Sequence, residues 1–289
     1  MSEVSSRFVK ANGINLAVHE CGQEYQAQQP TLVLVHATGF HGRCWDQVIQ
    51  RLEGRHVIAV DQRGHGASEQ KPFHNWAEFG EDLAALLTEL GVNGVEAVGH
   101  SMGGHASVAA AAHHPALFSK LLLIDPVILD PSFYAMWDEQ VLTGEPTHPA
   151  ARRRSQFSSR DDMYDRYRER LPFSLFTEAA MRDYCHHGLV DNDEGVQLAC
   201  APAHEARIYD SVCSNQSILE QAKTVSIPVT VARSMQPTKP EDIMDFRYSP
   251  TWKQLASQFP NGEDRLFEHL THFMPMQDPD QVAQLIREL

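Results

Sequence analysis

The stretch of the chain that most constrains its fold is residues 95–104, where an apolar run ends in Gly-His-Ser-Met-Gly and leads directly into an alanine-rich segment. This pattern predicts a β-strand that turns sharply into a helix, with Ser101 at the turn. The residues two before and two after such a serine must be small, and Gly99 and Gly103 occupy these positions. The G-x-S-x-G spacing is that of a nucleophile elbow, so we expect Ser101 to be the nucleophile. The backbone N–H of Met102, at the helix N-terminus, is then expected to face a developing oxyanion.

Composition and charge restrict the class of protein and its partners. The 289 residues are 42% hydrophobic and 21% charged, which is typical of one well-filled globular domain with room for a subdomain. The formal net charge of −14 disfavours nucleic acid and anionic membranes as partners, because both would be repelled. The first residues lack the apolar core of a signal peptide, and we find no apolar run long enough to span a bilayer. We therefore expect a soluble cytoplasmic protein that acts on a small molecule as a monomer or homodimer.

The cysteines and histidines give no indication of a metal or a cofactor. The five cysteines are an odd number at irregular spacing without a C-x-x-C pair, which is typical of free thiols in a reducing compartment. The histidine pairs at 113–114 and 186–187 cannot face one ligand, and no H-E-x-x-H motif is present. We expect neither a metal nor a cofactor.

Strand and helix patterns alternate through the first half of the chain. An alternating segment at residues 7–20, turning at Asn12-Gly13, predicts an antiparallel hairpin at a sheet edge. Buried strands are predicted at 31–36, 57–61, 95–100 and 120–126, and helices at 46–52, 76–90 and 105–113. This alternation predicts right-handed βαβ units in a parallel, doubly wound α/β sheet.

The alternation of strand and helix patterns stops between residues 127 and 226, where we find amphipathic segments but no continuous apolar run typical of a β-strand. We expect a helical insertion, with helices at 132–142, 161–171, 177–186 and 205–221, and with Gly144, Gly188 and Gly195 as its flexible points. After it, strands are predicted at 227–233 and 265–270 and helices at 251–259 and 279–289. The predicted organisation is a core of residues 1–126 and 227–289 with a cap of residues 127–226.

Four motifs in this order resemble those of the α/β-hydrolase fold family, and the resemblance extends over essentially the whole chain. It implies an eight-stranded, mostly parallel sheet with a helical cap between the sixth and seventh strands, as is usual for esterases, lactonases and carbon–carbon bond hydrolases. The motifs are an oxyanion loop, His36-Ala37-Thr38-Gly39; an Asp-x-Arg-Gly-x-Gly-x-Ser segment at 61–68; the elbow at 99–104; and a late histidine loop, Thr271-His272-Phe273-Met274-Pro275-Met276.

Two features of the chain depart from the family pattern. Ala37 replaces the usual second glycine of the oxyanion loop, which leaves the N–H of Thr38 available as a donor beside that of Met102. The family usually places an Asp directly after the seventh strand, and here residues 233–238 contain no carboxylate. Because the nucleophile is a serine, the resemblance disfavours epoxide hydrolases and haloalkane dehalogenases, which use Asp.

A serine nucleophile needs a base, and the base needs a carboxylate that fixes its tautomer. His272 follows the last predicted strand and is the expected base, since this fold uses the chain order Ser, acid, His. Asp245 and Asp125 are both candidates for the acid. Asp245 lies 27 residues before His272, in a segment that resembles the family's acid-to-histidine layout, whereas Asp125 ends the sixth strand, 24 residues after Ser101. Asp242 is a weaker third candidate. We expect His100 and His65 to pack or hydrogen-bond locally.

The expected reaction is hydrolysis of a small to medium carboxylic ester or lactone through an acyl-enzyme on Ser101. The N–H groups of Thr38 and Met102 would stabilise the oxyanion. Two alternatives remain open: the same three residues could hydrolyse a carbon–carbon bond or transfer an acyl group to another acceptor, or the chain could be a non-catalytic ligand-binding member of the fold.

Overall fold

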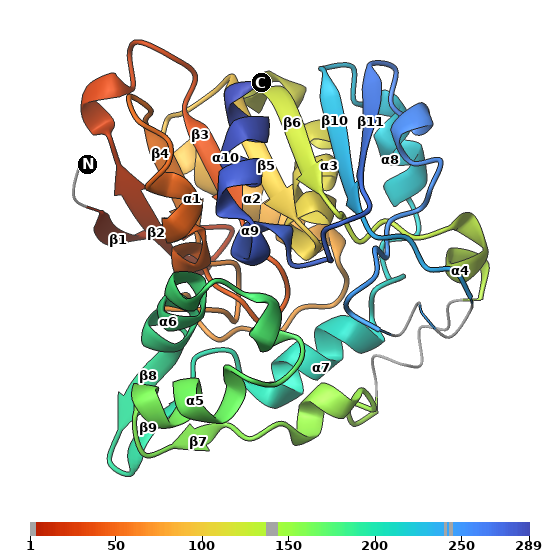
Figure 1. Cartoon of the computed structure of the whole chain (residues 1–289). Coiled ribbons are helices and arrows are strands. Elements are labelled where there is room, and N and C mark those ends of the chain that lie inside the picture. The colour runs from red at the N-terminus through yellow and green to blue at the C-terminus, as the bar shows by residue number, and fades with distance from the viewer. Residues whose placement is uncertain (1–3, 137–143, 240–241, 243–244) are drawn as a thin grey trace.

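The computed structural model of the chain describes residues 4–136, 144–239, 242 and 245–289. Within these residues an eight-stranded sheet forms the centre of the molecule (Figure 1). Its strands are β1 (Ser5–Ala11), β2 (Ile14–Cys21), β3 (Leu32–Val35), β4 (Val57–Val60), β5 (Val95–His100), β6 (Phe118–Ile124), β10 (Val229–Ser234) and β11 (Gly262–Phe267). In space they lie in the order β1-β2-β4-β3-β5-β6-β10-β11, and all neighbours from β4 to β11 are parallel. The predicted mostly parallel sheet is confirmed.

The edge of the sheet is the hairpin β1–β2, as the sequence predicts. The two strands pair antiparallel, and β2 pairs antiparallel with β4. Asn12 and Gly13 form the turn with φ angles of 46° and 71°. Positive φ at both turn residues matches the twist of the flanking strands, and Asn-Gly adopts it at low cost.

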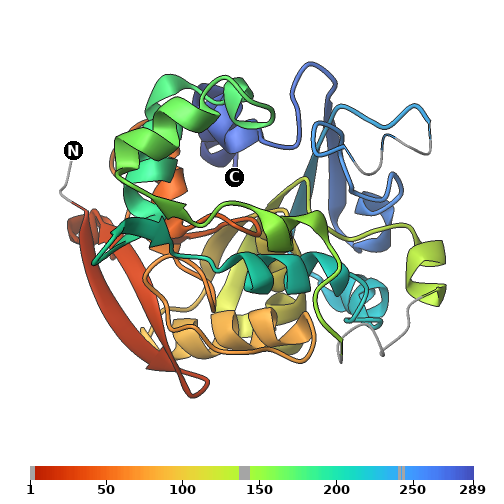
Figure 2. The ribbon, with the colours of Figure 1, turned by 90° about the horizontal axis from the view of Figure 1, so that it is seen from below.

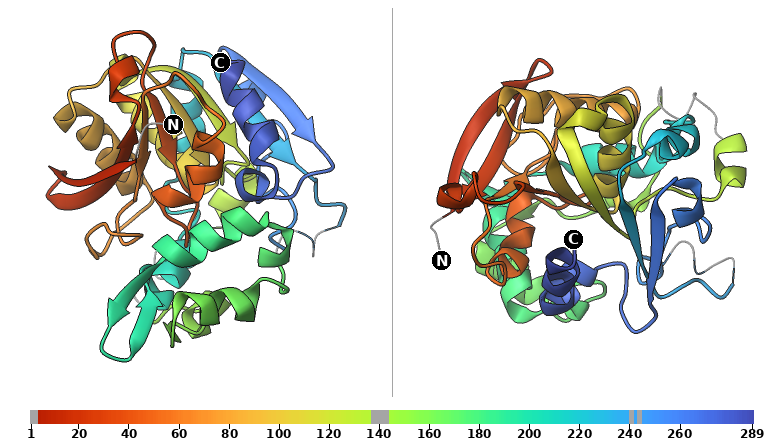
Figure 3. Two further views of the ribbon diagram at one scale, coloured as in Figure 1. Left: turned by 60° about the vertical axis from the view of Figure 1, so that its left-hand side comes forward. Right: turned by 90° about the horizontal axis from the view of Figure 1, so that it is seen from above.

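Helices cover both faces of the sheet (Figure 3). On one face lie α1 (Asp46–Ile49) and α10 (Pro279–Arg287), and on the other lie α2 (Ala77–Glu89), α3 (Met102–His113) and α8 (Ile218–Thr224). Side chains of a strand alternate between the faces, so Leu32 and Leu34 of β3 pack toward α1 and α10, and Val33 and Val35 toward α2 and α3. Burial on both sides explains why these strands are continuous apolar runs in the sequence.

A long insertion lies between β6 and β10, the sixth and seventh strands of the sheet, and apart from α8, which packs beside α3, most of it lies in the lower half of Figure 1. It contains short helices and also a three-stranded sheet, so the expectation of an insertion without strands is wrong. Strands of two to four residues are too short to give a periodic signal in the sequence. The elements are α4 (Pro131–Ala135), η5 (Pro149–Arg152), β7 (Gln156–Phe157), α5 (Arg160–Tyr167), η6 (Phe173–Leu175), α6 (Glu178–His187), β8 (Leu189–Asn192), β9 (Gly195–Leu198) and α7 (Pro202–Asp210).

Three predicted helices differ from the structure. The helix predicted at 251–259 is wrong: only the single 3₁₀ turn η8 (Ala256–Gln258) forms, since the N–H of Trp252 bonds to the carbonyl of Ile128. The helix predicted at 205–221 is two helices, α7 and α8, separated by turns at residues 211–217. The helix predicted at 132–142 is observed only as α4, and residues 137–143 lie outside the described residues.

The insertion lies against the ends of the strands that carry the predicted site, as the view from below shows (Figure 2). We keep the division into a core (1–126 and 227–289) and a cap (127–226) as a proposal. One element near its boundary touches the core: Ile218 and Ala222 of α8 are buried with residues of α3 in one apolar cluster. The part of the chain that the structure describes has no helix of the length and apolarity that a bilayer span requires.

Candidate active site

Ser101 lies at a sharp turn between β5 and α3. Its backbone adopts φ 56° and ψ −117°, which is unusual for a residue with a side chain and typical of a strained functional turn. A Cβ atom at Gly99 would lie 2.4 Å from the Gly103 carbonyl oxygen, and one at Gly103 would lie 2.2 Å from the Val35 carbonyl oxygen. Only glycine fits at either position, which confirms why the elbow needs small residues on both sides of the serine.

His272 lies beside Ser101, on the loop that follows β11. Its Nε2 is 3.1 Å from the Ser101 Oγ, within hydrogen-bond distance. The ring of His100 packs against that of His272, and the Nε2 of His100 donates to the His272 carbonyl oxygen at 2.8 Å. His100 therefore holds the backbone of His272. No local pattern connects these two histidines, because 172 positions separate them.

Asp125, at the end of β6, contacts the other ring nitrogen of His272. The Nδ1 of His272 donates to Oδ2 of Asp125 at 3.2 Å, so the ring is the Nδ1–H tautomer and Nε2 is free to accept from Ser101. Asp125 is completely buried. Burial raises the pKa of its carboxyl, but hydrogen bonds from His272, Ser234 and Ser249 outweigh burial and hold the pKa below its usual range. Asp125 is therefore a carboxylate at neutral pH.

Two serines that the sequence analysis missed hold the Asp125 carboxylate in place. The N–H of Ser234 donates to Oδ1 at 2.8 Å, its hydroxyl donates to Oδ2, and the hydroxyl of Ser249 donates to Oδ1 at 2.6 Å. Ser234 is the last residue of β10, where the family usually has an Asp close by. Since β6 and β10 are paired neighbours, a carboxylate at the end of β6 reaches the same space.

The other two predicted acids are directed elsewhere. The carboxylate of Asp245 pairs with Arg247 at the surface, with Nη2–Oδ2 at 2.5 Å, and this hydrogen bond lowers its pKa. Asp242 accepts from the N–H and hydroxyl of Thr238 and from the N–H of Lys239. The segment approaches the site through other groups: the His272 N–H donates to the Arg247 carbonyl oxygen, and the Ser249 hydroxyl donates to Asp125.

The loop after β3 brings the N–H of Thr38 close to the elbow. The Thr38 hydroxyl lies 3.5 Å from the Met102 sulfur, and Met102 is the first residue of α3, whose N–H has no acceptor within the helix. The N–H of Gly39 is bonded to the Nε2 of His65 at 3.0 Å, whereas the structure gives the Thr38 N–H no bond to any described residue. That these two N–H groups donate to an oxyanion stays a prediction.

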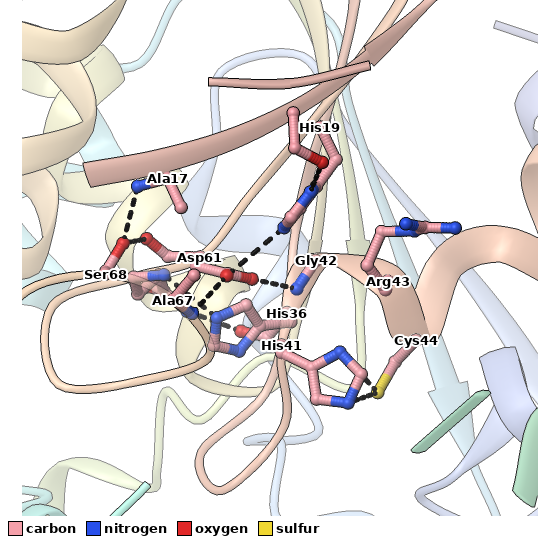
Figure 4. Close-up of polar contacts among 12 residues, drawn as sticks. Ala17, His19, His36, His41, Gly42, Arg43, Cys44, Asp61, Ala67 and Ser68 are labelled. Atoms are coloured by element: carbon pink, nitrogen blue, oxygen red, sulfur yellow. Dashed lines mark hydrogen bonds and ion pairs between the residues drawn. The ribbon is translucent and has the colours of Figure 1, made fainter. Parts of the chain in front are cut away.

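Asp61 fixes the far end of this loop (Figure 4). Its carboxylate accepts the N–H of Gly42 at 2.6 Å, the N–H of Ala67 at 2.8 Å and the Nε2 of His19 at 3.2 Å. Although burial raises its pKa, the hydrogen bond and charge of His19 dominate, and the pKa lies far below its usual range. Asp61 is a buried anion that ties the loop after β3 to the loop after β4.

Two neutral histidines hold the same loops. Nδ1 of His36 donates to the Ala37 carbonyl oxygen, and its Nε2 accepts from the N–H of Gln62. Nδ1 of His65 donates to the Arg63 carbonyl oxygen. A ring that donates through one nitrogen and accepts through the other is uncharged, and burial lowers the pKa of His36 to about 4 and that of His65 well below its usual value. Within the described ranges, no three His, Cys, Asp or Glu side chains are arranged to hold a metal ion.

Comparisons with known proteins identify the family of the chain. The sequence pattern of the alpha/beta hydrolase family matches residues 32–285. The chain is 35% identical over 123 residues to the 2-(acetamidomethylene)succinate hydrolase of Mesorhizobium japonicum, a match that covers 42% of each chain. It is 34% identical over 104 residues to the sn-1-specific diacylglycerol lipase ABHD11 of Mus musculus, covering 34% of this chain and 33% of the lipase. The matches thus span less than half of either relative.

A solved structure extends the likeness in fold to nearly the whole chain. The crystal structure of an E-2-(acetamidomethylene)succinate hydrolase superposes with a TM-score of 0.77 at 22% identity, covering 99% of this chain and 98% of the other. At this identity the comparison establishes the common fold alone.

Proposed function

This chain belongs to the alpha/beta hydrolase family, and from that premise we propose that it is a serine hydrolase that cleaves a small to medium carboxylic ester or lactone. One observation carries the proposal: a continuous hydrogen-bond chain runs from Asp125 through both ring nitrogens of His272 to the hydroxyl of Ser101. A serine hydroxyl is a poor nucleophile at its ordinary pKa, and this chain supplies the base and the orienting carboxylate that activate it.

In the first half of the reaction His272 is the general base. Nε2 takes the proton of Ser101 while Oγ forms a bond to the substrate carbonyl carbon, and Asp125 stabilises the resulting imidazolium. The N–H groups of Thr38 and Met102 donate to the oxyanion, each contributing roughly 3 kcal/mol in the transition state. The bond to the leaving oxygen then breaks, and His272 passes its proton to that oxygen. An acyl-enzyme on Ser101 remains.

Water completes the second half by the same route. Nε2 of His272 takes a proton from water as its oxygen attacks the acyl carbon, and the returning proton restores the Ser101 hydroxyl as the acid leaves. Every proton transfer uses Nε2 of His272. The tautomer that Asp125 fixes, with the proton on Nδ1, therefore serves both halves of the reaction. No metal or cofactor enters the proposed mechanism.

We assign the acid to Asp125 rather than to Asp245. The side chains of His272, Ser234 and Ser249 all donate to the Asp125 carboxylate. The Asp245 carboxylate is paired with Arg247 instead. This assignment favours catalysis over pure ligand binding, because a binding site needs no buried carboxylate aligned behind a histidine and a serine.

The named substrates of the relatives differ, one being a 2-(acetamidomethylene)succinate hydrolase and the other a diacylglycerol lipase. We therefore base the substrate class on the site. Ser101 and His272 are only 4% and 6% exposed, which favours a compact substrate enclosed by the insertion.

Five buried, unpaired cysteines support a cytoplasmic location, and the net charge supports a small molecule rather than nucleic acid as the partner. A monomer or homodimer remains a prediction, which light scattering would check.

The test is hydrolysis of p-nitrophenyl esters of increasing acyl length by the wild type and by Ser101→Ala, with a fluorophosphonate probe applied to both proteins. We expect turnover and labelling of the wild type, and neither with the variant. A folded wild-type protein that neither hydrolyses any ester nor takes the label would refute the proposal and favour a ligand-binding role.

A further inference from the structure

A buried ion pair from the insertion lies beside the oxyanion loop and takes no part in the mechanism above. Nη1 of Arg153 donates to Oε2 of Glu205 at 2.7 Å, and Nη2 donates to the Tyr184 hydroxyl at 2.9 Å. The three residues come from three separate elements: Arg153 follows η5, Tyr184 lies on α6 and Glu205 lies on α7. The Glu205 side chain is only 7% exposed.

The pair lies against the loop that follows β3, which carries the proposed oxyanion donor. The side chain of Glu205 lies directly on the backbone of Gly39, so that a Cβ atom there would be 2.8 Å from Oε1 and 3.0 Å from the carboxyl carbon. Gly39 is the neighbour of Thr38, the proposed oxyanion donor. The helix that carries Glu205, α7, passes between the sheet and the rest of the insertion (Figures 1 and 2).

Each member of the pair retains an unused hydrogen-bonding atom. Of the five N–H donors of Arg153, two are engaged, and neither its Nε nor Oε1 of Glu205 has a bond to any residue in the described ranges. Among the described residues, only Trp45, Arg55 and Gln62 have a side-chain polar atom that is buried and has no hydrogen-bond partner. Oε1 of Glu205 and Nε of Arg153 are not among them, so neither atom is both sealed from solvent and without a partner.

Packing alone gives no reason to bury two charges here. A well-packed apolar pair of similar volume is often as stabilising as a buried ion pair, because desolvation offsets the attraction. A charged pair beside an oxyanion loop, with unused N–H donors on Arg153 and an unused acceptor on Glu205, could instead recognise a ligand.

We propose that Arg153 and Glu205 form a subsite for a neutral acyl group that both donates and accepts hydrogen bonds, such as a primary carboxamide. The assignment rests on the proposed serine hydrolase function. The carbonyl oxygen of the amide accepts from Arg153, and its NH₂ group donates to Oε1 of Glu205. A carboxylate at this place is repelled by Glu205, an ammonium is repelled by Arg153, and an alkyl group leaves both polar atoms unsatisfied.

Three methyl esters of equal acyl size test the subsite: methyl succinamate, monomethyl succinate and methyl 4-methylpentanoate, which end in a carboxamide, a carboxylate and an isopropyl group. Acid release is followed by pH-stat titration. We expect kcat/KM of the wild type to be about tenfold higher for the carboxamide than for either other ester, the discrimination of one paired polar group.

The variant Glu205→Gln removes the negative charge and keeps the size of the side chain. We expect it to raise the succinate-to-succinamate ratio of kcat/KM about tenfold, because the carboxylate is no longer repelled and the neutral Gln oxygen is a weaker acceptor for the amide than a carboxylate oxygen. Arg153→Met lowers kcat/KM for both polar esters relative to methyl 4-methylpentanoate. The control is Glu220→Gln on α8, a surface glutamate paired with Lys223, which leaves all ratios unchanged.

Two results would overturn the subsite. One is a wild-type preference for succinate or for the alkyl ester, and the other is an identical set of ratios in the wild type and Glu205→Gln. Both are distinct from failure of the proposed function, since hydrolysis of any of the three esters that disappears in Ser101→Ala upholds the hydrolase. A protein that hydrolyses p-nitrophenyl esters through Ser101 but none of the three methyl esters refutes the subsite and leaves the hydrolase standing.

Discussion

His65 offers a test of how the oxyanion loop is held in place. The ring is completely buried, accepts the N–H of Gly39 at 3.0 Å and donates to the carbonyl oxygen of Arg63 at 2.9 Å. It therefore connects the loop after β3 to the loop after β4, one residue away from the proposed donor Thr38. Replacing His65 by Ala removes this connection and leaves Ser101, His272 and Asp125 intact.

The structure sets the size of both effects of His65→Ala. The N–H of Gly39 loses its partner, which costs about 1–3 kcal/mol of folding free energy, whereas the carbonyl oxygen of Arg63 keeps a second partner in the Nε2 of His204 at 3.3 Å. Complete loss of one oxyanion donor costs about 10²–10³ in kcat. Thr38 is displaced rather than removed, so we expect kcat to fall about 10- to 100-fold, with KM nearly unchanged, because the donor acts mainly in the transition state.

The assay combines the kinetics of p-nitrophenyl butyrate with inhibition by butylboronic acid, which forms a tetrahedral adduct on the serine. We expect the boronic acid affinity of His65→Ala to fall in parallel with kcat. His56→Ala is the matched control: His56 is equally buried and bonds Thr31 and Glu20, but it precedes β4 at the opposite end of the sheet. An unchanged kcat in folded His65→Ala, or an equal fall in His56→Ala, would refute the reasoning.

Two further predictions concern stability. Burial lowers the pKa of His100 to about 3 and that of His105 to about 4, so between about pH 6 and pH 4 the unfolded chain binds more protons at both sites. The free energy of unfolding should therefore fall with decreasing pH, by up to about 1.4 kcal/mol per pH unit for each histidine. Urea unfolding at pH 7, 6 and 5 measures this, and an unfolding free energy that is the same at all three values would contradict the prediction. Gly103→Ala places a methyl group against the rigid carbonyl of Val35 and should cost more than about 4 kcal/mol, whereas Gly54→Ala, with a positive φ but open space, should cost about 1–2 kcal/mol. Equal melting temperatures of these two variants would show that the close approach at the elbow is unimportant.

Much of the fold follows from patterns within single elements. The central strands are apolar runs buried on both faces, the edge hairpin turns at Asn12-Gly13, and the elbow is defined within the five residues around Ser101. Such features depend on neighbours in the sequence, and their predictions are confirmed. The strands of the insertion are two to four residues long, and the segment at 251–259 forms only isolated turns, with the N–H of Trp252 bonded to the distant carbonyl of Ile128. Neither feature can be predicted from the neighbouring residues in the sequence.

The candidate acids show the same limit within the site. Asp125 and Asp245 both precede His272 in a plausible order, and nothing near either residue decides between them. The difference arises from pairing between β6 and β10, which brings Ser234 to Asp125 across 109 positions of sequence. His100, Ser249 and the ion pair of Arg153 with Glu205 are likewise defined by contacts between distant segments.

The most direct test of the central claim is kcat/KM for p-nitrophenyl butyrate in Asp125→Asn and Asp245→Asn, each confirmed to be folded. If the carboxylate of Asp125 orients His272 for attack by Ser101, Asp125→Asn loses about 10³–10⁴ in kcat, as expected for a base held in the wrong tautomer, and Asp245→Asn keeps its activity. Full activity of Asp125→Asn, with collapse of Asp245→Asn, would contradict the account.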